Sequence, residues 1–217
     1  MTEITPPTAR RERSPRGRGA VLRDELVRAA ATVLDRAGDP DAVTIRGVAA
    51  EVGVAPTAIY LHFADRDELM VTVVEERFAE FHRTIEAADP GGDPLDALVA
   101  RGEAYVRFAL AHPGHYRALF GLQVSTERAD LVARRQAAGA PAFQALIDAV
   151  QRALDAARLH GSDPYPIAIA IWSTVHGYAD LSRTCRPMLP DIRIVLTSLV
   201  AAFEATTPAP VGPVGSG

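Results

Sequence analysis

The spacing of apolar residues along the chain predicts helices almost throughout. Between residues 19 and 37, apolar side chains recur every three or four positions, which is the period of one helix face. Alternating β patterns are scarce, and Ala, Leu, Arg and Glu dominate, so we expect an all-α protein with about nine helices. The further predicted helices cover 65–87, 95–111, 115–121, 125–159 (as one or two), 164–183 and 191–205.

Residues 44–69, TIRGVAAEVGVAPTAIYLHFADRDEL, predict two short helices joined by a tight turn. The hydroxyl of Thr44 can accept an amide of the first turn and so begin the first helix. Gly53 can end it in the left-handed conformation, and Pro56 suits the first turn of the next helix. The apolar face of the first helix comprises Ile45, Val48, Ala49 and Val52.

The second short helix predicts an outward surface of Thr57, Ala58, Tyr60 and Leu61. Two helices joined by such a turn form a helix-turn-helix, whose second helix enters the DNA major groove. Hydroxyl and apolar side chains suit base edges and thymine methyl groups. The alternative is an ordinary helical hairpin, with Tyr60 and His62 as half-buried packing residues. In either case we expect the inward side chains to be Ala55, Ile59 and Phe63.

This segment resembles the DNA-binding signature of the tetracycline-repressor (TetR) family of regulators. Ala55 stands where the family often has a capping serine, and Arg66 replaces the more usual lysine. The first change weakens the start of the second helix, while the second keeps the positive charge. The residues that carry the resemblance are Thr44-Ile45-Arg46, Val48-Ala49, Gly53-Val54, Ile59-Tyr60, His62-Phe63, Arg66 and Leu69.

The resemblance implies a double-stranded DNA operator as partner. Phosphate contacts set affinity and its salt dependence, whereas base contacts set sequence preference. We expect Thr57, Ala58, Tyr60 and Leu61 to lie nearest the base edges. The residues expected to approach the DNA backbone are Thr44, Arg46, Thr57, Tyr60, His62 and Arg66.

Charge is distributed unevenly along a chain whose formal net charge is −4. Residues 1–23 hold six arginines against two glutamates, which leaves −8 for the remainder. We expect 1–18 to be a disordered basic arm that orders on DNA or, alternatively, a solvated tail. The domains predicted after this arm are a helix-turn-helix domain at 19–66, a ligand-binding and dimerisation domain at 67–205, and a disordered tail at 206–217.

The ADPGGDP segment at 88–94 should end a helix and mark the boundary between the DNA-reading unit and the larger bundle. In that bundle, 164–183 and 191–205 are apolar on more than one face, which requires burial on both sides. A second copy would supply the second side, giving a homodimer with two recognition helices; the TetR resemblance implies the same. The alternative is a monomer whose own helices wrap this pair. In a dimer, a charge at Leu196 or Leu199 would be desolvated and disruptive.

The middle and late helices carry enough aromatic surface to line an apolar effector pocket. Such residues also fill any helical core, so packing is the alternative for each. Trp172, His176 and Gly177 resemble a Trp–His–Gly signature in the C-terminal domain of one TetR-like subgroup. The shortage of charge predicts a small lipophilic effector. The candidate ligand-binding residues are Tyr105, Phe108, Phe120, Phe143, Trp172 and His176.

The sequence offers little support for an enzyme, a cofactor or a metal. No glycine-rich phosphate loop, G-x-S-x-G or HExxH motif occurs. His112 and His115 lie three apart, but Pro113-Gly114 should break the helix that would place both on one face. Cys185 is the single cysteine; it could sense oxidation or simply pack. No membrane segment or secretory signal is present, so we expect a cytoplasmic protein.

These observations together predict a dimeric TetR-like repressor that binds a palindromic operator and is released by a small apolar molecule. Two alternatives remain: a ligand-independent DNA-binding protein and an all-α enzyme. Turnover of a bound compound would indicate the enzyme, whereas DNA binding insensitive to small molecules would indicate the ligand-independent protein.

Overall fold

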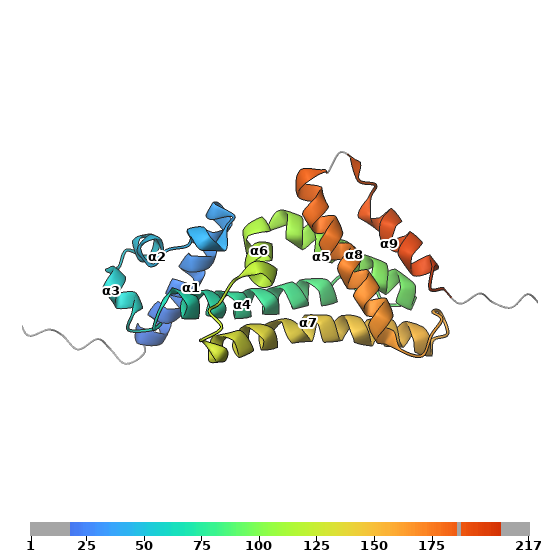
Figure 1. The fold of residues 1–217 in the computed structure, drawn as a ribbon, viewed down its shortest axis with the longest axis horizontal. Helices are drawn as coiled ribbons and strands as arrows, with labels where there is room; N and C mark the ends of the chain where they lie inside the picture. The colour runs from blue at the N-terminus through green and yellow to red at the C-terminus, as the bar shows by residue number, and fades with distance from the viewer. Residues whose placement is uncertain (1–17, 186–187, 205–217) are drawn as a thin grey trace, which may run out of the picture.

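The computed structural model describes residues 18–185 and 188–204, and within these ranges the chain forms nine α-helices and no multi-residue strand, as predicted (Figure 1). A short 3₁₀ helix, η1 (Pro40–Ala42), follows the first of them. The helices are α1 (Arg18–Ala37), α2 (Ile45–Val52), α3 (Pro56–Ile59), α4 (Arg66–Glu86), α5 (Pro94–Ala111), α6 (Pro113–Gly121), α7 (Ala129–Asp155), α8 (Pro164–Thr184) and α9 (Ile192–Ala201).

Local sequence fixes the ends of the helices around the turn. The Gly47 N–H donates to Thr44 Oγ1 (3.1 Å) at the start of α2. Gly53 ends α2 with φ at 76°. A residue with a side chain would be strained in this left-handed conformation. The Glu68 N–H donates to Asp65 Oδ1 (2.8 Å) at the start of α4. Ala55 provides no side-chain cap for α3, which spans only four residues.

Some predicted boundaries differ from the structure. The 125–159 segment forms a single helix, α7, with Pro141 inside it. The last predicted helix ends at Ala201 rather than near 205, and Ala55 is exposed rather than inward. The predicted arm and tail lie outside the described residues, except that Arg18 begins α1.

Helix α4 joins the two ends of the molecule. It runs alongside α7 and also packs against α1, α5 and α6, while α2 and α3 lie at one end and α8 and α9 at the other (Figure 1). The helix ends before 88–94, as predicted, yet the buried core continues across this region. A domain boundary at 66/67 or at 88–94 therefore stays a prediction. The α4 side chains buried in this core are Leu69, Met70, Val71, Thr72, Val73, Val74, Phe78 and Phe81.

Along the described helices, no segment is both long and apolar enough to cross a membrane.

The first turn of α6 packs unusually close to the last turn of α1. A Cβ atom on Gly114 would lie 2.5 Å from the backbone oxygen of Leu34 and 3.2 Å from the Cα of Gly38. Arg117 Nη1 donates to the Gly38 carbonyl (2.5 Å), which satisfies a backbone acceptor just beyond the end of α1. Glycine at 114 therefore permits the close contact between α1 and α6.

We expect Gly114→Ala to destabilise the protein by about 1–3 kcal/mol, because the added methyl group overlaps rigid backbone rather than a movable side chain. Gly121→Ala in the same helix is the control, since a Cβ there would meet no atom within 4 Å. Urea unfolding monitored by circular dichroism measures both. Equal stability of the two variants would contradict the close approach of α6 to α1.

Candidate DNA-binding and effector sites

Helix α3 and the turn after it present an exposed surface at the end of the molecule. Leu61 is 82% exposed and Tyr60 is 56% exposed, so two adjacent large side chains face solvent here. Ile59 and Phe63 are buried beneath them, at 0% and 1% exposure. The exposure of Tyr60 does not fit the alternative in which it is a half-buried packing residue. Of the other predicted contacts, Thr44, Arg46 and Thr57 are exposed, and Ala58 and His62 are partly buried.

Helix α1 holds this surface in place. The guanidinium of Arg23 lies 4.8 Å from the centroid of the Phe63 ring, so a cation–π contact covers the ring. The Phe63 N–H donates to the Ile59 carbonyl (3.0 Å), which extends the helical turn beyond α3. The turn that carries Tyr60 and Leu61 is therefore anchored on both sides by buried apolar groups.

Arg66 and Arg46 are placed very differently. Arg66 Nε donates to the Val43 carbonyl (2.6 Å), and Nη2 donates to the Pro40 carbonyl, so this side chain ties the η1 loop to α4. Its phosphate contact stays an untested prediction, but most of its donors are already used. Arg46 is exposed and has no ion-pair partner among the described residues, which leaves its guanidinium available to a phosphate.

The structure brings five of the six predicted ligand-binding residues into one aromatic cluster. His176 lies at its centre, with ring centroids 4.6 Å from Phe120, 4.7 Å from Trp172 and 5.1 Å from Tyr105. Phe143 packs edge-on against Trp172 at 4.9 Å. The sixth residue, Phe108, packs against His112 and against Phe81, whose ring separates it from Tyr105 of this cluster.

Hydrogen bonds fix the tautomer of His176. Its Nδ1 lies 3.0 Å from the Trp172 carbonyl, which has no proton to donate, so Nδ1 carries the hydrogen. The Tyr105 hydroxyl lies 2.9 Å from Nε2 and 3.0 Å from Nδ1, and because Nδ1 carries the hydrogen, the hydroxyl donates to Nε2. Burial lowers the pKa of His176 and raises that of Tyr105. Both side chains are therefore neutral at pH 7, in keeping with an apolar site.

An apolar cavity of about 30 Å³ lies beside this cluster, between α4, α5, α7 and α8. Its walls include Tyr105 and Trp172, whereas Phe120 and His176 line an open, more polar groove next to η1. Sites for drug-sized molecules occupy roughly 300–1,000 Å³. A ligand of that size could enter the cavity only if side chains or helices moved apart. The apolar lining residues are Ile85, Leu98, Ala142, Ala145, Leu146, Ile171 and Val175.

The sequence reasoning missed Arg101, a buried cation at the edge of this cavity. Its side chain is 6% exposed and donates to Glu86 Oε1 (2.5 Å) and Asp89 Oδ2 (3.0 Å). A hydrogen bond from the Gly91 N–H, together with Arg101, lowers the pKa of Asp89. Arg101 thus connects the cavity to the C-terminal end of α4. Its position on the apolar face, one turn before Tyr105, was the signal available in the sequence.

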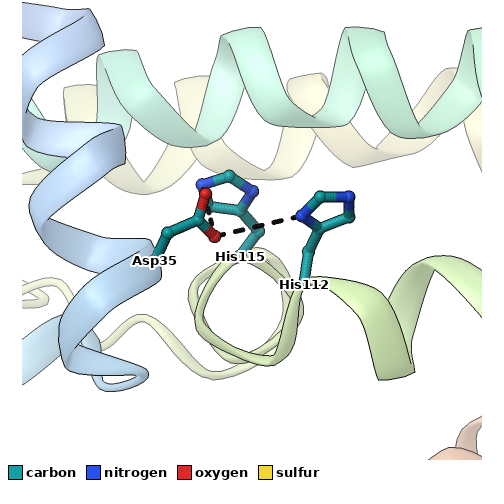
Figure 2. A group of neighbouring side chains, drawn as sticks. All are labelled: Asp35, His112 and His115. Carbon is teal, nitrogen blue, oxygen red and sulfur yellow. Dashed lines mark ion pairs between the residues drawn. The ribbon is translucent and has the colours of Figure 1, made fainter.

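The predicted separation of His112 and His115 is wrong. His112 ends α5 and precedes α6, and the two imidazole rings stack with centroids 5.6 Å apart and an interplanar angle of 20°. Pro113-Gly114 breaks the helix between α5 and α6, as expected. It does so directly after His112, so α6 restarts at once and keeps both rings on the same side, facing Asp35 of α1 (Figure 2).

Comparison with known proteins identifies two matching family profiles. Residues 26–73 match the profile of bacterial regulatory proteins of the tetR family, and residues 98–203 match the profile described as tetracyclin repressor-like, C-terminal domain. The chain is also 26% identical to an uncharacterised helix-turn-helix-type transcriptional regulator of Mycobacterium tuberculosis, over 84% of this chain and 80% of that protein.

Solved structures share this fold. A protein with unknown function from Rhodococcus sp. RHA1 superposes with a TM-score of 0.71 at 26% identity, covering 88% of this chain and 97% of its own. The regulator FadR from Bacillus subtilis, solved in complex with stearoyl-CoA, superposes with a TM-score of 0.64 at 15% identity, covering 82% and 95%. At that identity the second likeness extends to the fold alone.

Stability should fall as the pH drops from about 7.5 to 5.5, because burial lowers the pKa values of His115 and His176 in the folded protein. The unfolded chain takes up protons near the ordinary histidine pKa of about 6.5, so acid favours unfolding. His176→Gln should reduce this loss. Urea unfolding at both pH values measures it, and an undiminished pH dependence in the His115→Gln/His176→Gln double variant would contradict it.

Proposed function

We propose that this chain, which belongs to the tetR family of bacterial regulatory proteins and is a DNA-binding transcriptional regulator, acts as a dimeric repressor. In this proposal the dimer binds a palindromic operator in the cytoplasm, and a small apolar molecule releases it. The observation that carries the DNA-binding surface is the exposure of Tyr60 and Leu61 above the buried Ile59 and Phe63.

On DNA, we place α3 and the turn after it in the major groove. Tyr60 and Leu61 are large side chains exposed directly after α3, so they are our candidates for base contacts together with Thr57 and Ala58. Thr44 and Arg46 lie at the start of α2, where a phosphate would meet a positive helix end and an available guanidinium. Arg66 binds the Val43 and Pro40 carbonyls, so we rank Arg66 and His62 after Arg46 as candidates for phosphate contacts.

For the dimer, we propose an interface built on an exposed stripe of α8. Its members recur every four residues, so they form one exposed ridge that winds gradually around the helix: Tyr165, Ile169, Ser173, Gly177 and Leu181. The small residues in the middle would let a partner helix approach closely, and the large apolar ones would pack at both ends. Ile194 adds a 60% exposed apolar side chain from α9.

The burial of Leu196 changes how the dimer should be tested. Leu196 is 0% exposed within a single chain, so a charge there would disrupt the protomer itself. Leu196 has no surface left to offer a partner, whereas Leu199 is only partly buried. Exposed members of the stripe offer the cleaner test.

For release from DNA, we propose that an effector widens the cavity beside Trp172 and shifts α4. Arg101 borders the cavity and binds Glu86 and Asp89 at the end of α4, while Arg66 at the other end of α4 binds the Val43 and Pro40 carbonyls, which precede α2 of the helix-turn-helix. Coupling between two such sites is typically about 1–3 kcal/mol. If no small molecule changed the operator affinity of the dimer, the result would support the ligand-independent alternative.

Replacement of Tyr60 or Leu61 by alanine should weaken binding to the preferred operator by about 1–3 kcal/mol, while Arg46→Ala should mainly reduce the slope of log affinity against log salt by about 0.9. Fluorescence anisotropy with DNA from the region flanking the gene measures both. Because all three side chains are exposed, stability should not change. Parental affinity in both Tyr60→Ala and Leu61→Ala would remove α3 from the DNA interface.

Substitution of Leu181 by aspartate should convert the dimer to a folded monomer, because a charge in the apolar interface would be left unpaired. Leu181 is 49% exposed within one chain, so the protomer should tolerate the change. Val21→Asp is the matched control, since Val21 is a 54% exposed apolar residue on α1. Sedimentation velocity that showed a Leu181→Asp dimer as stable as the parent would place the interface elsewhere.

A further inference from the structure

Three side chains with metal-binding chemistry meet where α1 contacts α6 (Figure 2). Asp35 comes from the last turns of α1, His112 from the junction of α5 and α6, and His115 from the first turn of α6. One ligand atom from each lies within 4.8 Å of the other two. The DNA-contacting surface and the aromatic cluster include none of these residues.

The distances are close to those of a coordination sphere. Asp35 Oδ1 lies 3.3 Å from His115 Nε2 and 4.0 Å from His112 Nδ1. Zinc bonds to nitrogen and oxygen of about 2.0–2.1 Å in a tetrahedron place neighbouring ligand atoms roughly 3.4 Å apart. The first distance already matches, and a shift of less than about 1 Å by the imidazole of His112 would match the second.

The backbone holds the ligands in this arrangement. Gly114 lies between the two histidines and packs directly against the Leu34 carbonyl, which brings the start of α6 to the side of α1 that carries Asp35. His115 is fixed, with 5% of its side chain exposed, whereas Asp35 and His112 are each 44% exposed. A cation can therefore reach the site from solvent, and a water molecule can complete its coordination.

A hydrogen-bond network accounts for only part of this geometry. His115 Nε2 lies 3.4 Å from the Ala31 carbonyl as well as 3.3 Å from Asp35, so a proton on Nε2 would satisfy both acceptors. His112 Nδ1 faces the same carboxylate at 4.0 Å, which is too far for a hydrogen bond. The Nδ1 atom of His112 thus faces the Asp35 carboxylate without a hydrogen bond to it.

The groups around this cluster both favour and oppose a bound cation. Burial lowers the pKa of His115, and the nearby Arg77 lowers it further, while Asp35 raises it. The imidazole is therefore neutral at pH 7 and has a lone pair to offer once its hydrogen sits on Nδ1. Arg77 opposes a cation, whereas Asp35 and the carbonyl groups at the end of α1 favour one.

We propose that Asp35, His112 and His115 bind one divalent transition-metal ion of the Zn²⁺ type, which joins α1 to α6. Two imidazoles and a carboxylate are ligands of borderline softness, and three protein ligands with one open position are common for zinc. The ion would fasten the DNA-binding end of the molecule to the bundle. This inference does not depend on the proposed repressor mechanism.

Isothermal titration calorimetry of the full chain tests the proposal, with the affinity tag removed and ZnCl₂ as the only titrant at pH 7.5. The parent should bind one Zn²⁺ per chain. His112→Ala and Asp35→Asn should each weaken this binding by at least about 10-fold, since each removes a direct ligand. Both positions are half-exposed, so both variants should fold. His82→Ala, which removes a histidine of α4, should bind as the parent does.

Two further measurements test by other means whether the ion binds at this site. Co²⁺ should give visible absorption bands of a four-coordinate site in the parent and in His82→Ala, but not in His112→Ala. Zn²⁺ at 100 times the Kd of the parent should shift the folding equilibrium of the parent about 100-fold and that of His112→Ala by no more than about 10-fold. The absence of stoichiometric binding in the parent, or parental affinity in both His112→Ala and Asp35→Asn, would overturn the proposal.

Discussion

The burial of α4 on several sides is the constraint on which the rest of this structure depends. Phe78 and Phe81 pack against aromatic rings of α5 and α6, whereas Leu69 and Met70 are buried in the same core near the start of α4. A helix packed at both ends cannot bend locally without opening a cavity, so it responds to a disturbance as a rigid body. The helix-turn-helix end of the molecule and the cavity beside Trp172 are therefore physically connected through α4.

Polar contacts hold α4 to its neighbours at both ends. Near its start, Arg128 pairs with Asp65 and Arg134 pairs with Glu75, which fastens α4 to α7 and to the segment before it. Near its end, the buried Arg101 holds Glu86. Breaking a buried pair leaves an uncompensated charge, which costs several kcal/mol. Movement in the cavity should thus displace the whole of α4 rather than separate it from Arg101.

The contact between α1 and α6 is a second, independent link between the two ends of the molecule. Arg117 donates to the carbonyl of Gly38, and Gly114 allows the two backbones to approach. Any ion held by Asp35, His112 and His115 would strengthen this link without touching α4. The position of the DNA-binding end can therefore be changed from two places in the fold. One is the apolar cavity beside Trp172, which acts through α4, and the other is the contact between α1 and α6.

The sequence determined what depends on local chemistry, and the tertiary structure decided what depends on packing between distant segments. Helical periodicity, Thr44 and Gly53 predicted the helices and the turn, because caps and left-handed glycine act within a few residues. The buried Leu196 and the commitment of Arg66 to loop carbonyls could not be predicted, since each depends on a partner brought close only by folding. The cluster of Asp35 with His112 and His115 shows the same limit: its members come from separate helices, and their distance is set by the packing of α6 on α1.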